Sequence, residues 1–304
     1  MSGTKRVLQT IEAHWSSHSE VSRRYLLTEL IGRGGHGEVW QAQDLQTPGR
    51  ILAIKRLLPG IGMADSQIRF RVEIDALQRL GQHPHIVSLH GYGEHYGQPY
   101  LVMDYVRGYS LAMLIRHWQR QLPAARPDLR TIGYVLEALA LALHHVHAHG
   151  ILHRDVKPSN VLIGYENGVL RVRLCDFGIA RVGPRGITQP GERLGTDEYM
   201  SPEQASSAWA PMTPASDLFS LAVVAMELLT LQASSPDGTP YSNYVVNHWA
   251  RLPSQLFRMW PGIPGKLVSL LTLALAPRLE DRTPHAARLL QQLREVFSSE
   301  VHFV

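Results

Sequence analysis

The stretch from residue 153 to residue 178 constrains this chain more than any other part of its sequence. It reads HRDVKPSNVLIGYENGVLRVRLCDFG. Asn167-Gly168 is a strong signal for a two-residue hairpin turn, so we expect strands near Val161–Ile163 and Leu170–Leu174. Four polar residues of the kinds that serve in active sites lie around this hairpin: Asp155, Lys157, Asn160 and Asp176. The fold must therefore bring this set of side chains together around a short hairpin.

These polar side chains suit the transfer of a phosphoryl group from Mg-ATP to a hydroxyl group. This chemistry needs a carboxylate that accepts the hydroxyl proton, a cation that neutralises the moving phosphoryl group, and an amide and a second carboxylate that hold the metal. The stretch resembles the catalytic and DFG loops of the protein kinase superfamily. The resemblance implies that Asp155 takes the proton and Lys157 neutralises the γ-phosphoryl group. It also implies that Asn160 and Asp176 bind Mg²⁺, with Mn²⁺ as an alternative ion.

Residues 32–39 read GRGGHGEV and match the pattern GxGxxGxV. Glycine lets a backbone approach a triphosphate closely, where a Cβ atom would collide. Alone, the pattern is equally typical of a glycine-rich hairpin. A strand follows it here, whereas a dinucleotide-binding fingerprint would pass into a helix. The kinase resemblance implies ATP contacts from this loop and the next strand, made by Ile31, Gly32, Gly34, Gly37, Val39 and Ala53.

The lysine of Ala53-Ile54-Lys55 resembles the strand lysine that contacts the α- and β-phosphates of ATP. Its expected partner is Glu73 on the next helix, and Asp75 is a shorter competitor. Taken alone, Lys55 or Glu73 could be an ordinary charged residue on the protein surface. The resemblance also places a hinge around residues 103–108. There Met103 would lie behind the adenine, and backbone groups of Asp104 and Val106 would pair with the base. Core packing accounts equally well for Met103.

Residues 195–203 read GTDEYMSPE and resemble the end of the activation segment in Ser/Thr kinases. By that resemblance Thr196 hydrogen-bonds near Asp155 and Lys157 and shapes the acceptor site. Glu203 would pair with Arg282, which favours a protein kinase over a phosphotransferase that acts on a small molecule. Asp217 resembles the buried aspartate that anchors the catalytic loop.

Control of activity is expected at the activation segment. Arg154 precedes the catalytic aspartate, and in relatives such an arginine grips a phosphate on this segment. Thr188 lies eight residues before Thr196, where bacterial relatives often carry a phosphorylated threonine. Pro190 replaces a second threonine of those relatives, so we expect autophosphorylation at Thr188 alone. Such a reaction in trans would involve transient self-association.

Histidines and the single cysteine allow other interpretations. His145 and His149 have the spacing of a zinc-binding helix, but no glutamate follows the first histidine and a third ligand is missing. His147 instead matches a histidine that kinases carry before the catalytic loop, and His153 is interpreted as a structural residue. Cys175 is interpreted as a small buried packing residue in preference to a reactive thiol.

The order of elements predicts an α+β protein with the two-lobed kinase fold, a β-rich N-lobe (25–103) and a mainly helical C-lobe (108–296). Strands are expected near Ile86–Tyr92 and Tyr100–Asp104. The expected helices are Asp65–Leu80 (apolar side Ile68, Val72, Leu77 and Leu80), Leu129–His149, Ala215–Leu231, Pro264–Leu275 and Pro284–Val296. Residues 1–24 form an extension and 297–304 a tail. In the extension, Val7, Leu8, Ile11 and Trp15 predict a short docked helix, with a partner-docking segment as the alternative.

Composition adds limits rather than a function. The net charge of +4 comes from scattered residues, so we expect no nucleic-acid partner, and the longest apolar stretch is too short to span a membrane. One cysteine and no signal-peptide core predict a cytoplasmic protein. We therefore expect an ATP-dependent Ser/Thr kinase that acts on proteins. A pseudokinase scaffold and a small-molecule phosphotransferase remain as alternatives.

Overall fold

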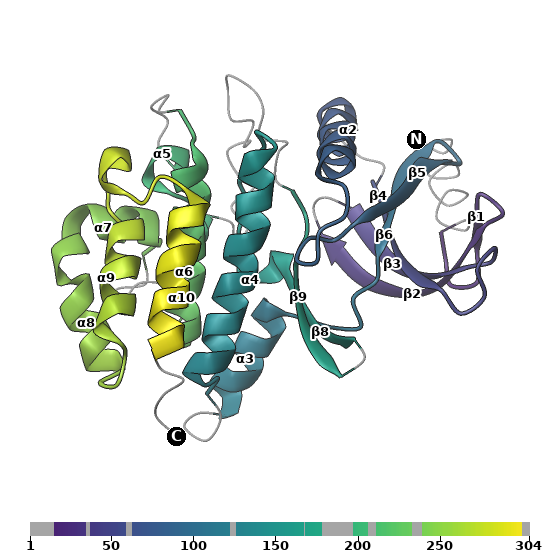
Figure 1. The fold of residues 1–304 in the computed structure, drawn as a ribbon. Helices are drawn as coiled ribbons and strands as arrows, with labels where there is room; N and C mark the ends of the chain where they lie inside the picture. The colour runs from purple at the N-terminus through teal and green to yellow at the C-terminus, as the bar shows by residue number, and fades with distance from the viewer. Residues whose placement is uncertain are drawn as a thin grey trace. The chain divides into compact units, whose positions relative to one another are not determined.

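The computed structural model describes residues 15–34, 37–58, 63–121, 126–166, 168–177, 197–205, 211–232 and 239–299. They belong to two compact units, shown in Figure 1. The first unit falls within residues 1–83 and 87–106, and the second within residues 84–86 and 107–304.

The first unit contains an antiparallel sheet with one long helix. Its elements are β1 (Glu20–Val21), β2 (Tyr25–Gly34), β3 (Gly37–Asp44), β4 (Ile51–Arg56), α2 (Met63–Leu80), β5 (Leu89–His95) and β6 (Gln98–Asp104). The strands lie in the order β1-β2-β3-β4-β6-β5. The turn between β3 and β4 contains Gly49 at a φ of +83°, where a glycine is favoured.

Alternation along the strands divides the sheet into two faces. One face carries a core cluster that includes Leu27, Trp40, Ile54 and Val102. The opposite face carries Leu101 and Met103, which pack with residues of α2 such as Phe70 and Ile74. Because successive side chains of a strand point to opposite faces, Val39, Ala53 and Lys55 share this second face with Met103.

Helix α2 forms within two residues of the predicted bounds, and its predicted apolar side is partly right. Leu77 and Leu80 are buried as predicted, but Ile68 is exposed, and Phe70 and Ile74 are buried instead. The helical period brings these residues to one face together with Glu73. Glu73 is a charged residue on this buried side, so a search for apolar residues alone does not identify the side correctly.

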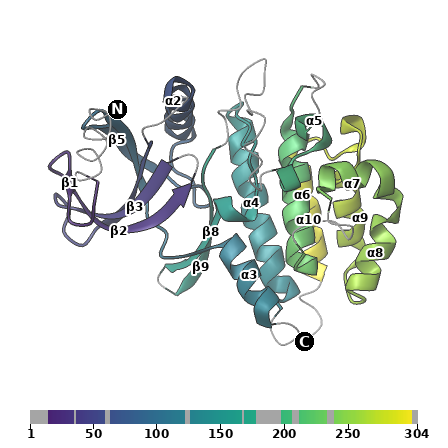
Figure 2. The ribbon, with the colours of Figure 1, turned by 180° about the vertical axis from the view of Figure 1, so that it is seen from behind.

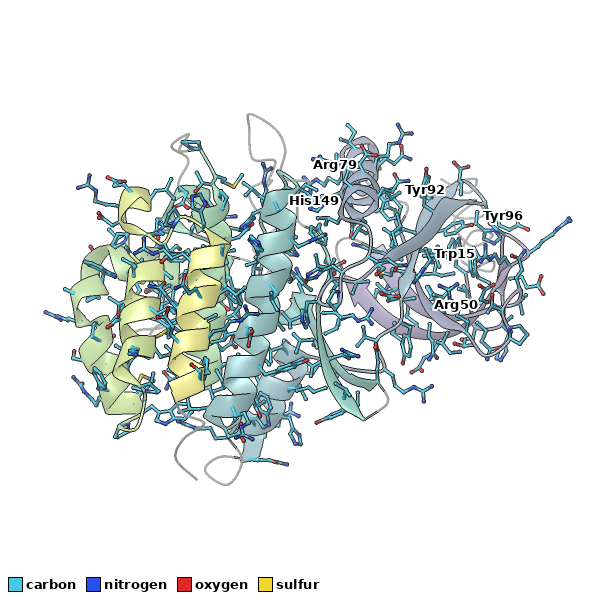
Figure 3. The ribbon with its side chains drawn as sticks, in the orientation of Figure 1. Trp15, Arg50, Arg79, Tyr92, Tyr96 and His149 are labelled. Atoms are coloured by element: carbon cyan, nitrogen blue, oxygen red, sulfur yellow. The ribbon has the colours of Figure 1, made fainter. Side chains whose placement is uncertain are left out.

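Residues 15–24 join the sheet of the first unit. β1 pairs with β2, and the N–H group of His18 donates to the carbonyl oxygen of Leu27 at 2.7 Å. Trp15 is buried in the core cluster, and Figure 3 labels it against the strands of this unit. Residues 1–14, which include most of the predicted N-terminal helix, lie outside the described residues.

The second unit is mainly helical in its described part. Its longer helices are α3 (Leu111–Gln121), α4 (Leu129–Ala148), α6 (Pro214–Thr230), α7 (Tyr241–His248), α8 (Leu252–Met259), α9 (Gly265–Ala274) and α10 (Ala286–Ser299). Short turns of helix are α5 (Pro202–Ala205), η1 (Pro158–Asn160), η3 (Asp197–Tyr199), η4 (Trp249–Arg251) and η5 (Leu279–Asp281). Figures 1 and 2 show α4, α6, α9 and α10 packed side by side.

Local signals explain where the two central helices begin and end. Asp128 caps α4 by accepting a hydrogen bond from the Thr131 N–H group at 2.6 Å, and Gly150, at a φ of +67°, follows its end. Thr213 and Ser216 form a capping box at the start of α6. The side chains of α6 are buried along its whole length, so this helix forms the centre of the second unit. Among the described residues, no helix combines the length and apolar character needed to cross a membrane.

A three-stranded sheet of β7 (Gly108–Ser110), β8 (Val161–Glu166) and β9 (Val169–Leu174) completes the second unit. β8 and β9 form the predicted hairpin, in which Gly168 has a φ of +76°. Ile86 was expected in a strand of the first unit, and that prediction is wrong. Ile86 instead forms a parallel bridge with Leu174, and strand β5 begins three residues later at Leu89.

Candidate active site

Lys55 and Glu73 form a buried ion pair in the first unit. The Lys55 Nζ atom lies 2.8 Å from Oε1 and 2.9 Å from Oε2 of Glu73. Only 6% of Lys55 and 8% of Glu73 is exposed, so these residues are not ordinary surface charges. Asp75, the other acidic candidate, is exposed. A carboxylate that holds the ammonium group with both oxygens fixes the lysine in one position.

The glycines of residues 32–37 differ in what the protein requires of them. Gly37 has a φ of +129°, and a Cβ atom there would collide with the carbonyl oxygen of Arg56. A Cβ atom at Gly32 would make only ordinary contact with Val39, and one at Gly34 would meet nothing within 4 Å. The close approach of the Arg56 backbone therefore explains why residue 37 is glycine. No comparable contact among the described residues requires glycine at positions 32 and 34.

An apolar surface adjoins Lys55 on the same face of the sheet. Val39 is the register partner of Lys55, and Ala53 is the register partner of Met103. Met103 is partly buried and packs against the core cluster of α2, so core packing is one of its roles. Ile31 is exposed, at a register shift between Leu30 and Gly32. The first unit thus presents a fixed cation beside apolar side chains.

The side chain of Asp104 is held by groups that the sequence motifs did not indicate. Its Oδ2 atom accepts a hydrogen bond from the Ser88 N–H group at 3.0 Å, and its Oδ1 atom lies 2.6 Å from His90 Nε2. His90 Nδ1 in turn lies 3.0 Å from Arg50 Nη2. The Asp104 side chain therefore ties the start of the predicted hinge to β5 and, through His90, to Arg50, the residue before β4.

In the second unit, Asp155, Lys157 and Asn160 form one cluster. Lys157 Nζ lies 2.8 Å from Asp155 Oδ2, and Asn160 Nδ2 donates to the same oxygen at 2.9 Å and to the Asp155 carbonyl oxygen at 2.8 Å. Within the described residues, both side-chain contacts go to Oδ2 and none to Oδ1. The carboxylate of Asp155 is therefore held through one of its two oxygens.

Asp176 is placed by the end of β9. The Cys175 N–H group donates to the Asn160 carbonyl oxygen at 2.9 Å, so the residue before Asp176 is tied to the catalytic loop. Asp176 has a φ of +56°, an uncommon backbone conformation for a residue other than glycine. Phe177 is buried with its ring centre 4.7 Å from that of His153. Cys175 is buried, as its packing interpretation predicts.

Asp217 anchors the catalytic loop from the buried helix α6. Its carboxylate accepts hydrogen bonds from the N–H groups of His153 and Arg154, at 2.9 and 2.8 Å, and lies 2.8 Å from His147 Nε2. His153 is fully buried, and burial lowers its pKa against the opposing effect of Asp217. His153 is therefore a neutral structural residue, as predicted.

The predicted pair of Glu203 and Arg282 is present. Arg282 Nη1 and Nη2 lie 2.7 and 2.9 Å from the two carboxylate oxygens of Glu203. Burial pushes the pKa of Glu203 up, but hydrogen bonds from Arg282, Ser201 and Ser216 outweigh it and the pKa is lowered. This bidentate pair ties α5 to residues 276–282, since Arg282 also donates to the Ala276 carbonyl oxygen.

Comparisons with known proteins place these elements in a family. The family model described as "Protein kinase domain" matches residues 25–292. The chain belongs to the protein kinase domain family. It is 33% identical over 262 residues to a probable serine/threonine-protein kinase PknB of Lactococcus lactis, which covers 85% of this chain and 40% of that protein. It is 40% identical over 217 residues to the serine/threonine-protein kinase PknA of Mycobacterium tuberculosis, covering 69% of this chain and 47% of that protein. The chain thus spans less than half the length of these relatives.

Solved structures agree with this kinase family. The kinase domain of PknI from Mycobacterium tuberculosis has a TM-score of 0.66 and 27% sequence identity, and the match covers 92% of this chain and 98% of that chain. The predicted α+β kinase fold, with a β-rich and a mainly helical part, is confirmed.

The kinase structure also contains a partly buried polar pair that the sequence analysis missed. The Tyr199 hydroxyl donates to Glu227 Oε2 at 2.6 Å. Burial raises the pKa of Glu227, with a smaller opposing effect of this hydrogen bond. Glu227 interrupts an otherwise apolar helix, and that interruption was the available signal.

Several predicted kinase residues lie outside the described part of the chain. They are Thr188, Thr196, and Gly35 and His36 of the glycine-rich loop. Arg154 is described and has a φ of +65°. Its carbonyl oxygen accepts from Gln204 Nε2 at 3.1 Å, whereas its Nε atom is buried without a hydrogen-bond partner among the described residues. Burial lowers the pKa of Arg154, and Asp217 opposes this effect.

Proposed function

We propose that this chain is an active Ser/Thr protein kinase that transfers the γ-phosphoryl group of Mg-ATP to protein hydroxyl groups. The observation that carries this proposal is the bidentate Lys55–Glu73 pair, at 2.8 and 2.9 Å. A buried lysine held in one position by a carboxylate supplies fixed positive charge for phosphates. Relatives named serine/threonine-protein kinases support the same reaction class.

The first unit would bind the nucleotide. Lys55 would contact the α- and β-phosphates, and the backbone at Gly32 and Gly34 would approach the phosphates closely. This role would explain why positions 32 and 34 are glycine, which side-chain packing does not explain. Val39, Ala53, Ile31 and Met103 would contact the adenine as apolar surface, while backbone groups of Asp104 and Val106 would pair with its edge.

The second unit would bind the acceptor hydroxyl group. Asp155 Oδ1, which takes no hydrogen bond within the described residues, would accept the hydroxyl proton. The hydroxyl oxygen would form a bond to the γ-phosphorus as the bond to the β,γ-bridging oxygen breaks and ADP leaves. Lys157 would neutralise the charge on the phosphoryl group during this step.

The oxygen atoms of Asn160 and Asp176 fit a magnesium ion. Asn160 uses its amide nitrogen on Asp155, so its amide oxygen faces no hydrogen-bond partner among the described residues. Amide and carboxylate oxygens are ligands that Mg²⁺ accepts, with phosphate oxygens and waters completing its shell. When bound, Mg²⁺ or Mn²⁺ would neutralise charge on the phosphates.

Protein, rather than a small molecule, is the acceptor that the second unit favours. The Glu203–Arg282 pair fixes α5, directly after the residues that resemble the end of an activation segment. In this proposal Thr196 shapes the acceptor site beside Asp155 and Lys157. A small-molecule phosphotransferase would need no such tie.

Control of the activity would come from the activation segment. We infer autophosphorylation at Thr188, in trans and through transient self-association. Arg154 would receive the phosphate, because its buried Nε atom has no hydrogen-bond partner among the described residues.

The test follows labelled phosphate from γ-labelled Mg-ATP with a mixture of protein substrates and, separately, a metabolite extract. The proposal expects label on serine or threonine of polypeptides with the wild-type chain, and none with Asp155→Asn. Label on a metabolite alone would favour the small-molecule alternative. Binding of Mg-ATP with no transfer in either assay would favour the scaffold.

A further inference from the structure

Trp15 precedes the residues that match the kinase family model, yet it is part of the core of the first unit. Only 3% of it is exposed, and it belongs to the cluster that also contains Trp40, Ile54 and Tyr100. Its ring packs edge-on against His95, with ring centres 5.5 Å apart. Figure 3 labels Trp15 beside the sheet. A core residue here extends the folded unit beyond the family match.

The residues that follow Trp15 hold it in place. Ser22 Oγ lies 2.7 Å from the Tyr100 hydroxyl group, and the Ser22 N–H group donates to His95 Nδ1. His18, Ser22 and Arg23 all adopt positive φ, between 54° and 70°. Such conformations cost free energy in residues other than glycine, so they persist only where surrounding contacts determine them. Residues 15–24 are therefore a specifically docked segment.

The charged partner of Trp15 is Arg56. The guanidinium carbon of Arg56 lies 4.9 Å from the ring centre of Trp15, within the range of a cation–π contact. Arg56 is itself buried and forms an ion pair with Glu38, with Nη2 2.7 Å and Nε 2.9 Å from Oε2. Trp40 Nε1 donates to the same oxygen at 3.2 Å. Arg56 Nη1 has no hydrogen-bond partner among the described residues, so the Trp15 ring and Glu38 hold this guanidinium group.

This buried cluster lies directly behind the proposed nucleotide-binding residues. Arg56 follows Lys55 on β4, and Glu38 follows Gly37 on β3. Glu38 and Arg56 are register partners, as are the next pair, Val39 and Lys55. Because adjacent residues of a strand point to opposite faces, the first pair packs with Trp15 and the second faces the α2 side. The carbonyl oxygen of Arg56 also touches the position where Gly37 would carry a Cβ atom.

We propose that Trp15 is a positioning residue for nucleotide binding, acting through the Arg56–Glu38 pair on the strands that carry Gly37 and Lys55. This inference rests on the proposed function. Trp15 then controls the affinity of the site for nucleotide without touching the nucleotide itself. A residue outside the family match thus acts on the nucleotide-binding strands.

The experiment measures Mg-ADP binding to the full chain by calorimetry, with the unfolding temperature measured in parallel. Trp15→Leu keeps an apolar side chain but loses the ring face, whereas Trp15→Phe keeps a ring. We expect Trp15→Leu to raise Kd about tenfold, equivalent to about 1.4 kcal/mol. Trp15→Phe should stay within about threefold of the wild type. Val21→Ala, in the same docked segment and core cluster, is the matched control and should lower stability with little change in Kd.

A second variant separates coupling from general loss of stability. Glu38→Gln with Arg56→Met removes the ion pair as a unit, which proteins often tolerate. This pair of changes should weaken Mg-ADP binding, and adding Trp15→Leu should weaken it little further, because both act through one pathway. Equal Kd values for Trp15→Leu and wild type would overturn the inference. So would additive effects, or equal effects of Leu and Phe at position 15. If the wild type itself does not bind Mg-ADP, the proposed function fails instead.

Discussion

The side-chain amide of Asn160 holds Asp155 at two atoms, donating to its carbonyl oxygen at 2.8 Å and to its Oδ2 atom at 2.9 Å. With Lys157 also on Oδ2, these contacts orient the carboxylate, and Oδ1 takes no hydrogen bond among the described residues. The orientation of Asp155 thus depends on Asn160, whose own amide oxygen is proposed to bind the metal.

Asp155→Asn should remove turnover while nucleotide binding remains. The amide that replaces the carboxylate cannot accept the hydroxyl proton, and general base catalysis contributes about 10²–10⁴-fold to such reactions. We expect kcat to fall by about this factor, with Kd for Mg-ADP within about threefold of wild type. Steady-state kinetics and calorimetry on the same preparations check both values. Unchanged kcat would rule out Asp155 as the base.

Glu73→Gln should reduce both stability and nucleotide affinity, whereas Asp75→Asn on the same helix should change neither. The first change leaves the buried Lys55 ammonium group without its charged partner. Breaking a buried pair in this way typically costs about 3–5 kcal/mol. Asp75 is exposed and therefore serves as a matched control for the helix. Urea unfolding and Mg-ADP titration of both variants make the comparison, and similar results for the two would contradict the role of the pair.

Arg282→Met should destabilise the chain by about 3–5 kcal/mol, because it leaves the Glu203 carboxylate without its ion-pair partner. Replacing both residues with methionine should recover much of this loss. Because the pKa of Glu203 is lowered on folding, the stability that it contributes is present above its unfolded pKa of about 4.5 and is lost as pH falls through the lower folded value. Denaturant unfolding between pH 3 and 7 should show a larger loss in wild type than in the double variant, which keeps the lowered pKa values of Asp44 and Asp128.

Glu227→Gln should stabilise the protein above neutral pH. Burial raises the pKa of Glu227, so the folded state favours the protonated carboxyl group and the ionised form costs stability as pH rises above the unfolded pKa. A glutamine keeps an oxygen acceptor for the Tyr199 hydroxyl group. The stability difference between variant and wild type should be largest at pH 8 and vanish at pH 4. A constant difference across this range would show that the carboxylate is not the cause.

Thr188→Ala should lower activity if phosphorylation of this residue switches the kinase on. The expected result is reduced transfer to added protein, with the Kd for Mg-ADP unchanged. Arg154→Gln should have a similar effect, because the phosphate would lose its cation. Full activity of Thr188→Ala, with no phosphate on residues 181–193, would contradict this role.

Most of the candidate site could be predicted from sequence because its residues have fixed local spacings. Asp155, Lys157 and Asn160 lie close together in sequence, and the β8–β9 hairpin brings the residue before Asp176 back to Asn160. The tie between Glu203 and Arg282 spans 79 positions and was predictable only through the resemblance to kinases.

The parts that were missed depend on contacts without a regular spacing. The spacing of apolar residues predicted that Trp15 docks on the β-rich part, but it did not predict the contact of Trp15 with Arg56. Ile86 is a residue type typical of strands, but it forms a bridge with Leu174 of β9, within the second unit. On α2, Phe70 and Ile74 are buried beside Glu73, a charged residue that a pattern of apolar residues alone leaves out.

The most direct test of the central claim is the intact mass of the purified full chain after incubation with Mg-ATP, followed by phosphosite mapping. An Asp155→Asn preparation, purified identically, serves as the control. We predict that wild type alone gains mass in units of phosphate, on serine or threonine and including Thr188. No gain in wild type, or an equal gain in both preparations, would contradict the claim that this chain is an autophosphorylating protein kinase.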